Sequence, residues 1–170
     1  MPFLREVLER PRSLQEDQTL RSVVKTAMSV NHFSEDETLF CTGDAAQACY
    51  FVSQDYVYLQ ATMACRPSGW IAEMCLWTAW THVGDLICRS FNKTIAISAE
   101  AFCVTISKAG PLQKAAHKYA MLYVSQLQDA DDPNDLWQHG EAREDGQVSL
   151  STWRMVHRDP SIRVSPAAQR

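Results

Sequence analysis

The residues with the greatest potential for chemistry lie in one stretch, Trp70–Val83, which combines a carboxylate, a histidine and three tryptophans. Glu73 is the carboxylate, and in such apolar surroundings it needs hydrogen-bond donors, which backbone amides can supply. The tryptophans can stack on a purine, although packing in a core or an interface is the commoner role of such a cluster. We therefore treat this stretch as a candidate ligand site with Glu73 as its polar anchor.

Motifs of catalysis are missing from the sequence. It has no P-loop, no Gly-x-Ser-x-Gly motif and no paired-carboxylate signature. Its histidines and cysteines do not follow a zinc spacing, and no two histidines lie close enough in sequence for the metal set of a cupin enzyme. We predict that the protein is not an enzyme and holds no metal or resident cofactor. The six cysteines are expected to be buried, reduced thiols: Cys41, Cys49, Cys65, Cys75, Cys88 and Cys103.

Composition predicts a single soluble domain. The 170 residues, 46% hydrophobic and 21% charged, are enough to build a core without disulfides or metal. No apolar run approaches the roughly 20 residues that span a bilayer, so these residues contain no transmembrane helix. The net charge of -4 excludes a nucleic-acid partner, whose phosphates require a basic surface. Charges near Met1 interrupt any secretory signal, so we expect a cytoplasmic location and an unused sequon at Asn92.

Hydrophobic periodicity predicts helices first and a β-rich region after them. Two helical patterns fall within the first thirty residues, the second extending through Met28, and Pro11 separates them. Short alternating runs punctuated by turns then follow, as in an antiparallel sandwich or barrel. The expected strands are 38–41, 48–52, 56–60, 86–88 and 94–97.

Helix returns at Ser98, whose hydroxyl can cap a helix that runs to Lys108. Gly110-Pro111 then ends that helix and starts another, since proline suits the first helical position. The last helix carries one apolar stripe, formed by Leu112, Ala116, Tyr119, Ala120, Tyr123 and Leu127.

The chain therefore divides into a helical segment, 1–30, a β-rich domain with C-terminal helices, 31–128, and a tail, 129–170. Between Asp129 and Asp145 the tail holds seven acidic residues against one arginine, and the remainder is basic. Such self-repelling composition is typical of disorder. We expect the tail not to contribute to folding, so that a chain ending at Gln128 should be as stable as the full chain.

The segment Phe33–Val52 resembles the opening strands of the cyclic-nucleotide-binding domain family. It has a hydrophobic-Phe pair, then x-x-Gly-Asp at Gly43-Asp44, then a Tyr-Phe-Val strand at residues 50–52. Gly43 has a physical reason to be there, because a tight turn between strands requires a residue tolerant of positive φ. Asp55 stands where the family has another turn glycine, and aspartate adopts left-handed conformations more readily than most residues.

The stretch Trp70–Val83 resembles the family's phosphate-binding cassette. Glu73 falls on the glutamate that accepts from the ribose 2′-hydroxyl, and Ala72 replaces the preceding glycine. The arginine that pairs with the cyclic phosphate has no counterpart, its place falling near Thr81 or His82. Loss of such a charge-assisted pair commonly costs about 2–5 kcal/mol of binding. We therefore expect cyclic nucleotides, cAMP or cGMP, to bind weakly.

The resemblance implies an α+β fold, with N-terminal helices, an antiparallel β-roll of the double-stranded β-helix or jelly-roll type, a hinge helix and a long amphipathic helix. It implies a set of ligand-site residues and a structural turn at Gly43 and Asp44. The implied ligand-site residues are Glu73, Met74, Cys75, Leu76, Thr81, His82, Tyr119 and Tyr123.

The function that this resemblance implies is non-catalytic regulation. The tryptophan-rich cassette is similar to those of voltage-gated cation channels of protists, dinoflagellates especially, so a cytosolic gating module of a potassium-type channel is the leading expectation. A regulatory subunit of a kinase is an alternative, as is a structural interaction domain whose pocket holds its own side chains. The expected partners are a membrane-embedded channel domain or a kinase catalytic subunit, and copies of the chain that associate through terminal helices.

Overall fold

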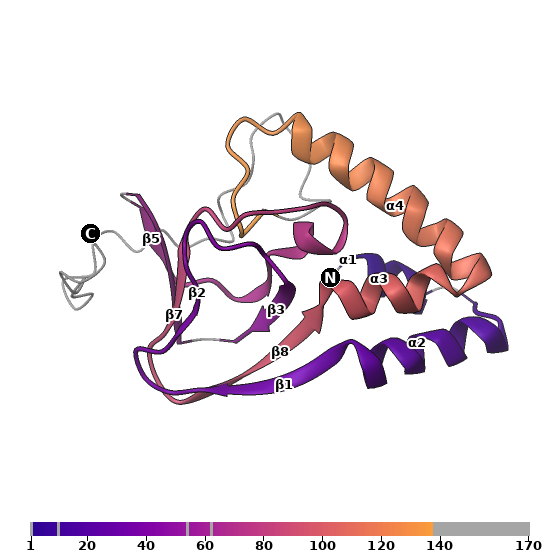
Figure 1. Ribbon diagram of the computed structural model, residues 1–170, viewed down its shortest axis with the longest axis horizontal. Coiled ribbons are helices and arrows are strands. Elements are labelled where there is room, and N and C mark those ends of the chain that lie inside the picture. The colour runs from indigo at the N-terminus through magenta and orange to yellow at the C-terminus, as the bar shows by residue number, and fades with distance from the viewer. Residues whose placement is uncertain (1, 10, 54, 62, 138–170) are drawn as a thin grey trace.

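Strands form the centre of the protein and helices pack at one end of them (Figure 1). The computed structural model describes residues 2–9, 11–53, 55–61 and 63–137. The strands are β1 Met28–Phe33, β2 Thr38–Phe40, β3 Ala48–Val52, β4 Tyr56–Gln60, β5 Met63–Cys65, β6 Gly69–Ile71, β7 Asp85–Cys88 and β8 Asn92–Ser98. The helices are α1 Pro2–Glu9, α2 Leu14–Thr26, the short 3-10 helix η1 Glu73–Leu76, α3 Ala99–Ser107 and α4 Gly110–Gln128.

The strands form two antiparallel sheets of four strands each, in the orders β1-β8-β3-β6 and β2-β7-β4-β5. This confirms the predicted α+β class, with helices before an antiparallel roll and two helices after it. The five expected strands are present as β2, β3, β4, β7 and β8. Strands β1, β5 and β6 were not predicted from the sequence. Two of them, β5 and β6, have only three residues each, which is too short for a clear alternating pattern.

The first boundary of the roll lies earlier than the sequence predicts. The helical pattern extends through Met28, but α2 ends at Thr26 and Met28 opens β1, opposite Ile97 of β8. Ser98 N–H donates to the Ala27 carbonyl at 2.9 Å. Apolar side chains at positions 27 and 28 are compatible with a helix or with a strand. The strand forms because backbone polar groups need hydrogen-bond partners and β8 supplies them.

The expected structural turn is present and has a second role. Gly43 (φ 91°) and Asp55 (φ 78°) both adopt left-handed backbone, as their turn positions predict. Gly43 N–H donates to the His82 carbonyl (2.8 Å), and His82 N–H donates to the Asp44 carbonyl (2.9 Å). The Gly43-Asp44 turn therefore fixes the backbone of His82.

The C-terminal helices follow the predicted pattern. The hydroxyl of Ser98 accepts from Ala101 N–H at 3.3 Å and caps α3. On α4 the predicted stripe faces inward, with Ala120 half-buried and the others buried. The buried members are Leu112, Ala116, Tyr119, Tyr123 and Leu127.

Residues 129–137, which we name the strap, turn back from the end of α4 towards the roll (Figure 1). Asp135 is 0% exposed and Leu136 is 7% exposed. The strap thus packs on the domain, contrary to the expectation that the chain from Asp129 onward does not. The remainder of the expected tail, 138–170, lies outside the described residues.

Two of the six cysteines differ from expectation. Cys41, in the turn after β2, and Cys103, on α3, are exposed, although the Cys103 thiol still reaches the Leu76 carbonyl at 3.7 Å. Across the described ranges, no helix is long and apolar enough to cross a membrane. In the same ranges, no group of three or more His, Cys, Asp or Glu side chains is arranged to hold a metal ion.

Candidate functional site

The short helix η1 forms the floor of the candidate site, and all four of its residues are buried. Ala72, which precedes it, has left-handed backbone (φ 58°), a conformation that glycine adopts at lower cost. Glu73 Oε1 accepts from Tyr119 Oη (3.2 Å) and from Trp77 Nε1 (3.4 Å). Glu73 Oε2 has no hydrogen-bond partner among the described residues. Burial raises the pKa of this carboxyl, and the bonds from Trp77 and Tyr119 only partly oppose that shift.

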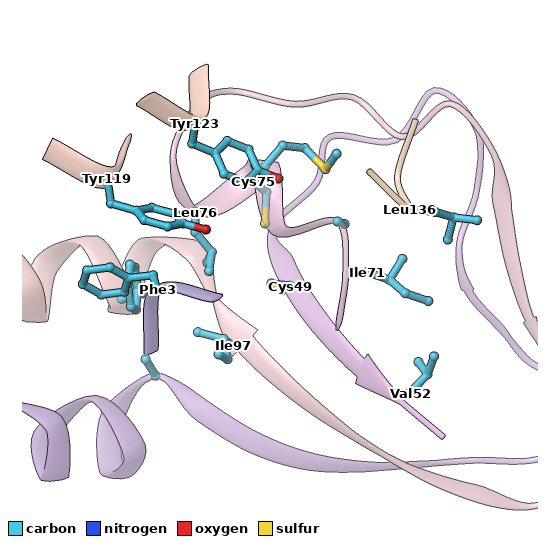
Figure 2. Packing of buried hydrophobic residues seen from close by; sticks show 14 of the residues in the cluster. Phe3, Cys49, Val52, Ile71, Cys75, Leu76, Ile97, Tyr119, Tyr123 and Leu136 are labelled. Atoms are coloured by element: carbon cyan, nitrogen blue, oxygen red, sulfur yellow. The ribbon is translucent and has the colours of Figure 1, made fainter. Parts of the chain in front are cut away.

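Helix α4 covers this floor with aromatic side chains. Tyr119 and Tyr123 point from α4 towards Cys75 and Leu76 of η1 (Figure 2). Trp77 packs against both, with its ring centroid 5.0 Å from that of Tyr119 and 6.3 Å from that of Tyr123. Because these rings are buried, the predicted positions Tyr119 and Tyr123 form part of a closed core.

Asp135 of the strap enters the site from the other side. Its Oδ1 accepts from Trp80 Nε1 (2.8 Å) and lies 2.7 Å from His82 Nδ1. Its Oδ2 accepts from Tyr58 Oη (2.8 Å) and from the backbone N–H groups of residues 83 (3.0 Å) and 84 (3.2 Å). The carboxylate therefore has five partners, about as many as its lone pairs can engage.

The rest of the strap is held by backbone and apolar contacts. The Asp135 carbonyl accepts from Ala72 N–H at 2.6 Å, so the left-handed residue of the cassette holds the strap as well. Leu136 joins the hydrophobic core, and Trp137 packs edge-on against Tyr123, with centroids 4.8 Å apart at 87°. Leu136 N–H is satisfied by Asn134 Oδ1 at 3.0 Å.

The electrostatics of the site favour an ionised Asp135. Burial by itself would raise the pKa of this carboxyl, but hydrogen bonds led by those of His82, Trp80 and Tyr58 outweigh it, and its pKa lies below the usual range. Burial and the neighbouring Asp135 charge raise the pKa of Tyr58, so the phenol remains a proton donor. The imidazole of His82 stacks on Phe40 at a centroid distance of 3.7 Å, which fixes its ring plane.

The structure brings most, but not all, of the predicted site residues together. Residues 73–76, Tyr119 and Tyr123 meet on one side of the cassette, and His82 meets Asp135 on the other. Thr81 is exposed and pairs with Ala45 in an isolated β-bridge, so its side chain takes no part. Sequence reasoning missed Asp135, Tyr58 and Gly84. The one available signal for the strap is the apolar pair at positions 136 and 137 inside an acidic run.

The comparisons with known proteins bear on the fold. No protein-family model and no curated protein matches the sequence. Among solved structures, the N-terminal domain of a transcriptional regulator from Streptomyces coelicolor A3(2) is 16% identical, with a TM-score of 0.51 over 81% of this chain and 92% of that one. The C-linker/CNBHD of zELK channels, crystallized in the presence of cAMP, is also 16% identical, with a TM-score of 0.50 over 78% of this chain and 70% of that one.

The fold is the cyclic nucleotide-binding β-roll. Within it, the strand β6, the helix η1 and the following loop carry Glu73 and His82, and we call this stretch the cassette because it resembles the family's cassette in sequence. The strap occupies that cassette with a carboxylate. The β-roll of this chain is therefore closed by its own residues, from α4 on one side and from the strap on the other.

Proposed function

We propose that the protein is a non-catalytic regulatory module of the cyclic-nucleotide-binding type whose ligand pocket is filled by its own strap. The observation that carries this proposal is the buried Asp135 carboxylate, which takes hydrogen bonds from His82 and two backbone amides of the cassette. An anion supplied by the chain thus stands in the region where the family resemblance leads us to expect a ligand anion.

The missing arginine supports the same function. The cassette offers an imidazole at His82 in the region of the expected guanidinium, and that imidazole is already engaged by Asp135. A cyclic nucleotide would have to displace a fully desolvated carboxylate and then bind without a bidentate cation. Both effects oppose binding, so we propose that cAMP and cGMP are at most weak ligands.

We propose further that the module belongs to the cytosolic part of a voltage-gated cation channel and transmits its state through the terminal helices. The similarity to the C-linker/CNBHD of zELK channels supports this proposal, together with the cassette resemblance to protist channels. A kinase regulatory subunit is the alternative. The genomic sequence upstream of Met1 distinguishes them: six apolar spans indicate a channel, and an arginine-rich inhibitor segment indicates a kinase subunit.

Calorimetric titration tests the filled pocket. We expect no saturable heat from cAMP or cGMP with the wild-type protein at concentrations up to about 100 µM. A dissociation constant near 1 µM, about -8 kcal/mol, would contradict the proposal. His82→Arg alone should change little, because Asp135 still fills the site, whereas His82→Arg combined with Asp135→Ala should gain measurable affinity. Circular dichroism of both variants checks that each remains folded.

A further inference from the structure

The donors around Asp135 form a site that is built for a carboxylate. They come from the rigid part of the roll, namely the fully buried Tyr58 of β4 and the loop at residues 80–84. Gly84 is necessary for this arrangement, since a Cβ at that position would overlap the Tyr58 ring. The turn Gly43-Asp44 holds the loop in place through His82. The donors are thus positioned by elements outside the strap.

The occupant also makes contacts that only a peptide can make. Beside the carboxylate, the backbone carbonyl of Asp135 pairs with Ala72 N–H (2.6 Å). The next two side chains then reach apolar surface, Leu136 in the core and Trp137 on Tyr123. The pocket thus engages an acidic side chain, one backbone group and two apolar side chains of a single segment, which forms a turn closed by the bond from Trp137 N–H to the Asn134 carbonyl (2.9 Å).

The charges of the site favour this ligand over a phosphate. Of the five groups that contact the Asp135 carboxylate, four are neutral donors and the fifth is the imidazole of His82. Neutral donors aimed at two oxygens suit a carboxylate, whereas a buried phosphate is normally recognised by the planar cationic fork of an arginine.

We propose that this pocket is a receptor for a short peptide turn that presents an aspartate followed by two large apolar residues, and that a partner protein displaces the strap with such a segment. The inference rests on the proposed function, because it takes the strap as the occupant of the ligand pocket. It adds the chemical class of the ligand that opens the pocket.

The test uses the full chain with Asp135→Ala, which empties the donor set. The probe is the strap peptide Pro-Asn-Asp-Leu-Trp, blocked at both ends, and the control probe carries asparagine in place of its aspartate. We expect the aspartate peptide to raise the melting temperature and to bind at least tenfold more tightly than the asparagine peptide. Adding Tyr58→Phe, which removes one donor, should weaken binding of the aspartate peptide several-fold and leave the asparagine peptide unaffected.

Inorganic phosphate, cAMP and cGMP are the competing probes. Stronger stabilisation by any of them than by the aspartate peptide would mean that the emptied pocket is a phosphate site, and the peptide inference would fail. The proposed function fails instead if a nucleotide binds the wild-type protein tightly, so the two failures are distinguishable. Equal binding of the two peptides, or binding of neither, together with no effect of the nucleotides, would overturn the peptide inference and leave the proposed function standing.

A chain that does not fold with Asp135→Ala is replaced by one with Asp135→Asn, which keeps the shape of the side chain. Recovery of a cooperative thermal transition in the presence of the aspartate peptide, and not of the asparagine peptide, supports the inference. Failure of both peptides to restore folding overturns it.

Discussion

The two buried carboxylates of the candidate site, Glu73 of the cassette and Asp135 of the strap, differ in how their hydrogen-bonding capacity is satisfied. Asp135 has five partners for its two oxygens, and its pKa is lowered because those hydrogen bonds outweigh the effect of burial. Glu73 has partners for Oε1 only, and burial raises its pKa. At the residue scale, the ionised form of Asp135 stabilises the closed structure, and the ionised form of Glu73 opposes it.

This difference predicts how Glu73→Gln affects stability at different pH values. The unfolded chain releases the Glu73 proton at a lower pH than the folded chain, so the free energy of unfolding falls as pH rises through the folded-state pKa. The amide of the variant keeps an oxygen for Tyr119 and Trp77 but cannot ionise. We expect the variant to match the wild type near pH 4 and to be more stable by about 1 kcal/mol at pH 8.

Urea unfolding of wild type and variant at several pH values measures this effect. Glu100→Gln, at an exposed position in the first turn of α3, is the control and should show no comparable rise with pH. A Glu73→Gln variant that is less stable than the wild type at pH 8 would mean that the ionised carboxylate is stabilising, contrary to the raised pKa.

At the scale of elements, the strap and helix α4 act as one cover. α4 presents Tyr119 and Tyr123 to the cassette, and the strap continues from its end to place Trp137 on Tyr123. Asp135 then anchors the strap in the roll. Without the strap, the buried donors of Tyr58, Trp80 and His82 lose their acceptor. Leaving a buried donor unsatisfied costs about 1–3 kcal/mol.

Removal of the strap should therefore destabilise the domain. We expect a chain ending at Gln128 to be less stable than a chain ending at Trp137 by about 3 kcal/mol, which lowers the melting temperature by about 10 °C. This replaces the prediction from composition that a chain ending at Gln128 loses nothing. Differential scanning calorimetry of the two truncated chains makes the comparison, with Asp132→Asn, at an exposed strap position, as the control substitution. Equal melting temperatures would show that the strap contributes no net stability.

At the scale of the whole molecule, aromatic rings connect the two ends of the described chain. Phe3 of α1 packs on Trp77 at a centroid distance of 5.3 Å, Trp77 lies 6.3 Å from Tyr123, and Tyr123 lies 4.8 Å from Trp137. Phe3 is only 1% exposed, so α1 is part of the core. Docking of the N-terminal helix and docking of the strap thus share one set of side chains, and each should depend on the other.

A double-mutant cycle tests this dependence. Phe3 packs on the rings of Trp77 and Tyr119, whereas Trp137 packs on the ring of Tyr123. If the two sites were independent, the effects of Phe3→Ala and Trp137→Ala on the free energy of unfolding would add. We expect instead a coupling of about 0.5–1 kcal/mol, because each substitution loosens the rings of Trp77 and Tyr123 that the other relies on. The matched pair Phe91→Ala with Trp137→Ala, in which Phe91 is 72% exposed, should be additive. Additive free energies in the first pair would separate α1 from the strap.

Local sequence pattern predicted most of the secondary-structure elements and the turns. Period-two runs placed β2, β3, β4, β7 and β8, the Gly43 and Asp55 turns followed from their tolerance of positive φ, and Ser98 capped α3 as expected. These features depend on interactions between residues that are close together in the chain, so they can be predicted from one sequence. The ligand role of the stretch around Glu73, and the weak binding expected from its missing arginine, come from the family resemblance and stay predictions.

Tertiary structure alone decided where Met28 and Asp135 belong. Met28 fits a helix stripe or a strand equally well, and only the free edge of β8 selects the strand. Asp135 looks like any other member of an acidic, solvated run, because its five partners lie more than fifty residues away in sequence. The acidic composition of the segment after Gln128 describes its average preference for water. At Asp135, hydrogen bonds satisfy every lone pair of the carboxylate, so this acidic side chain is buried.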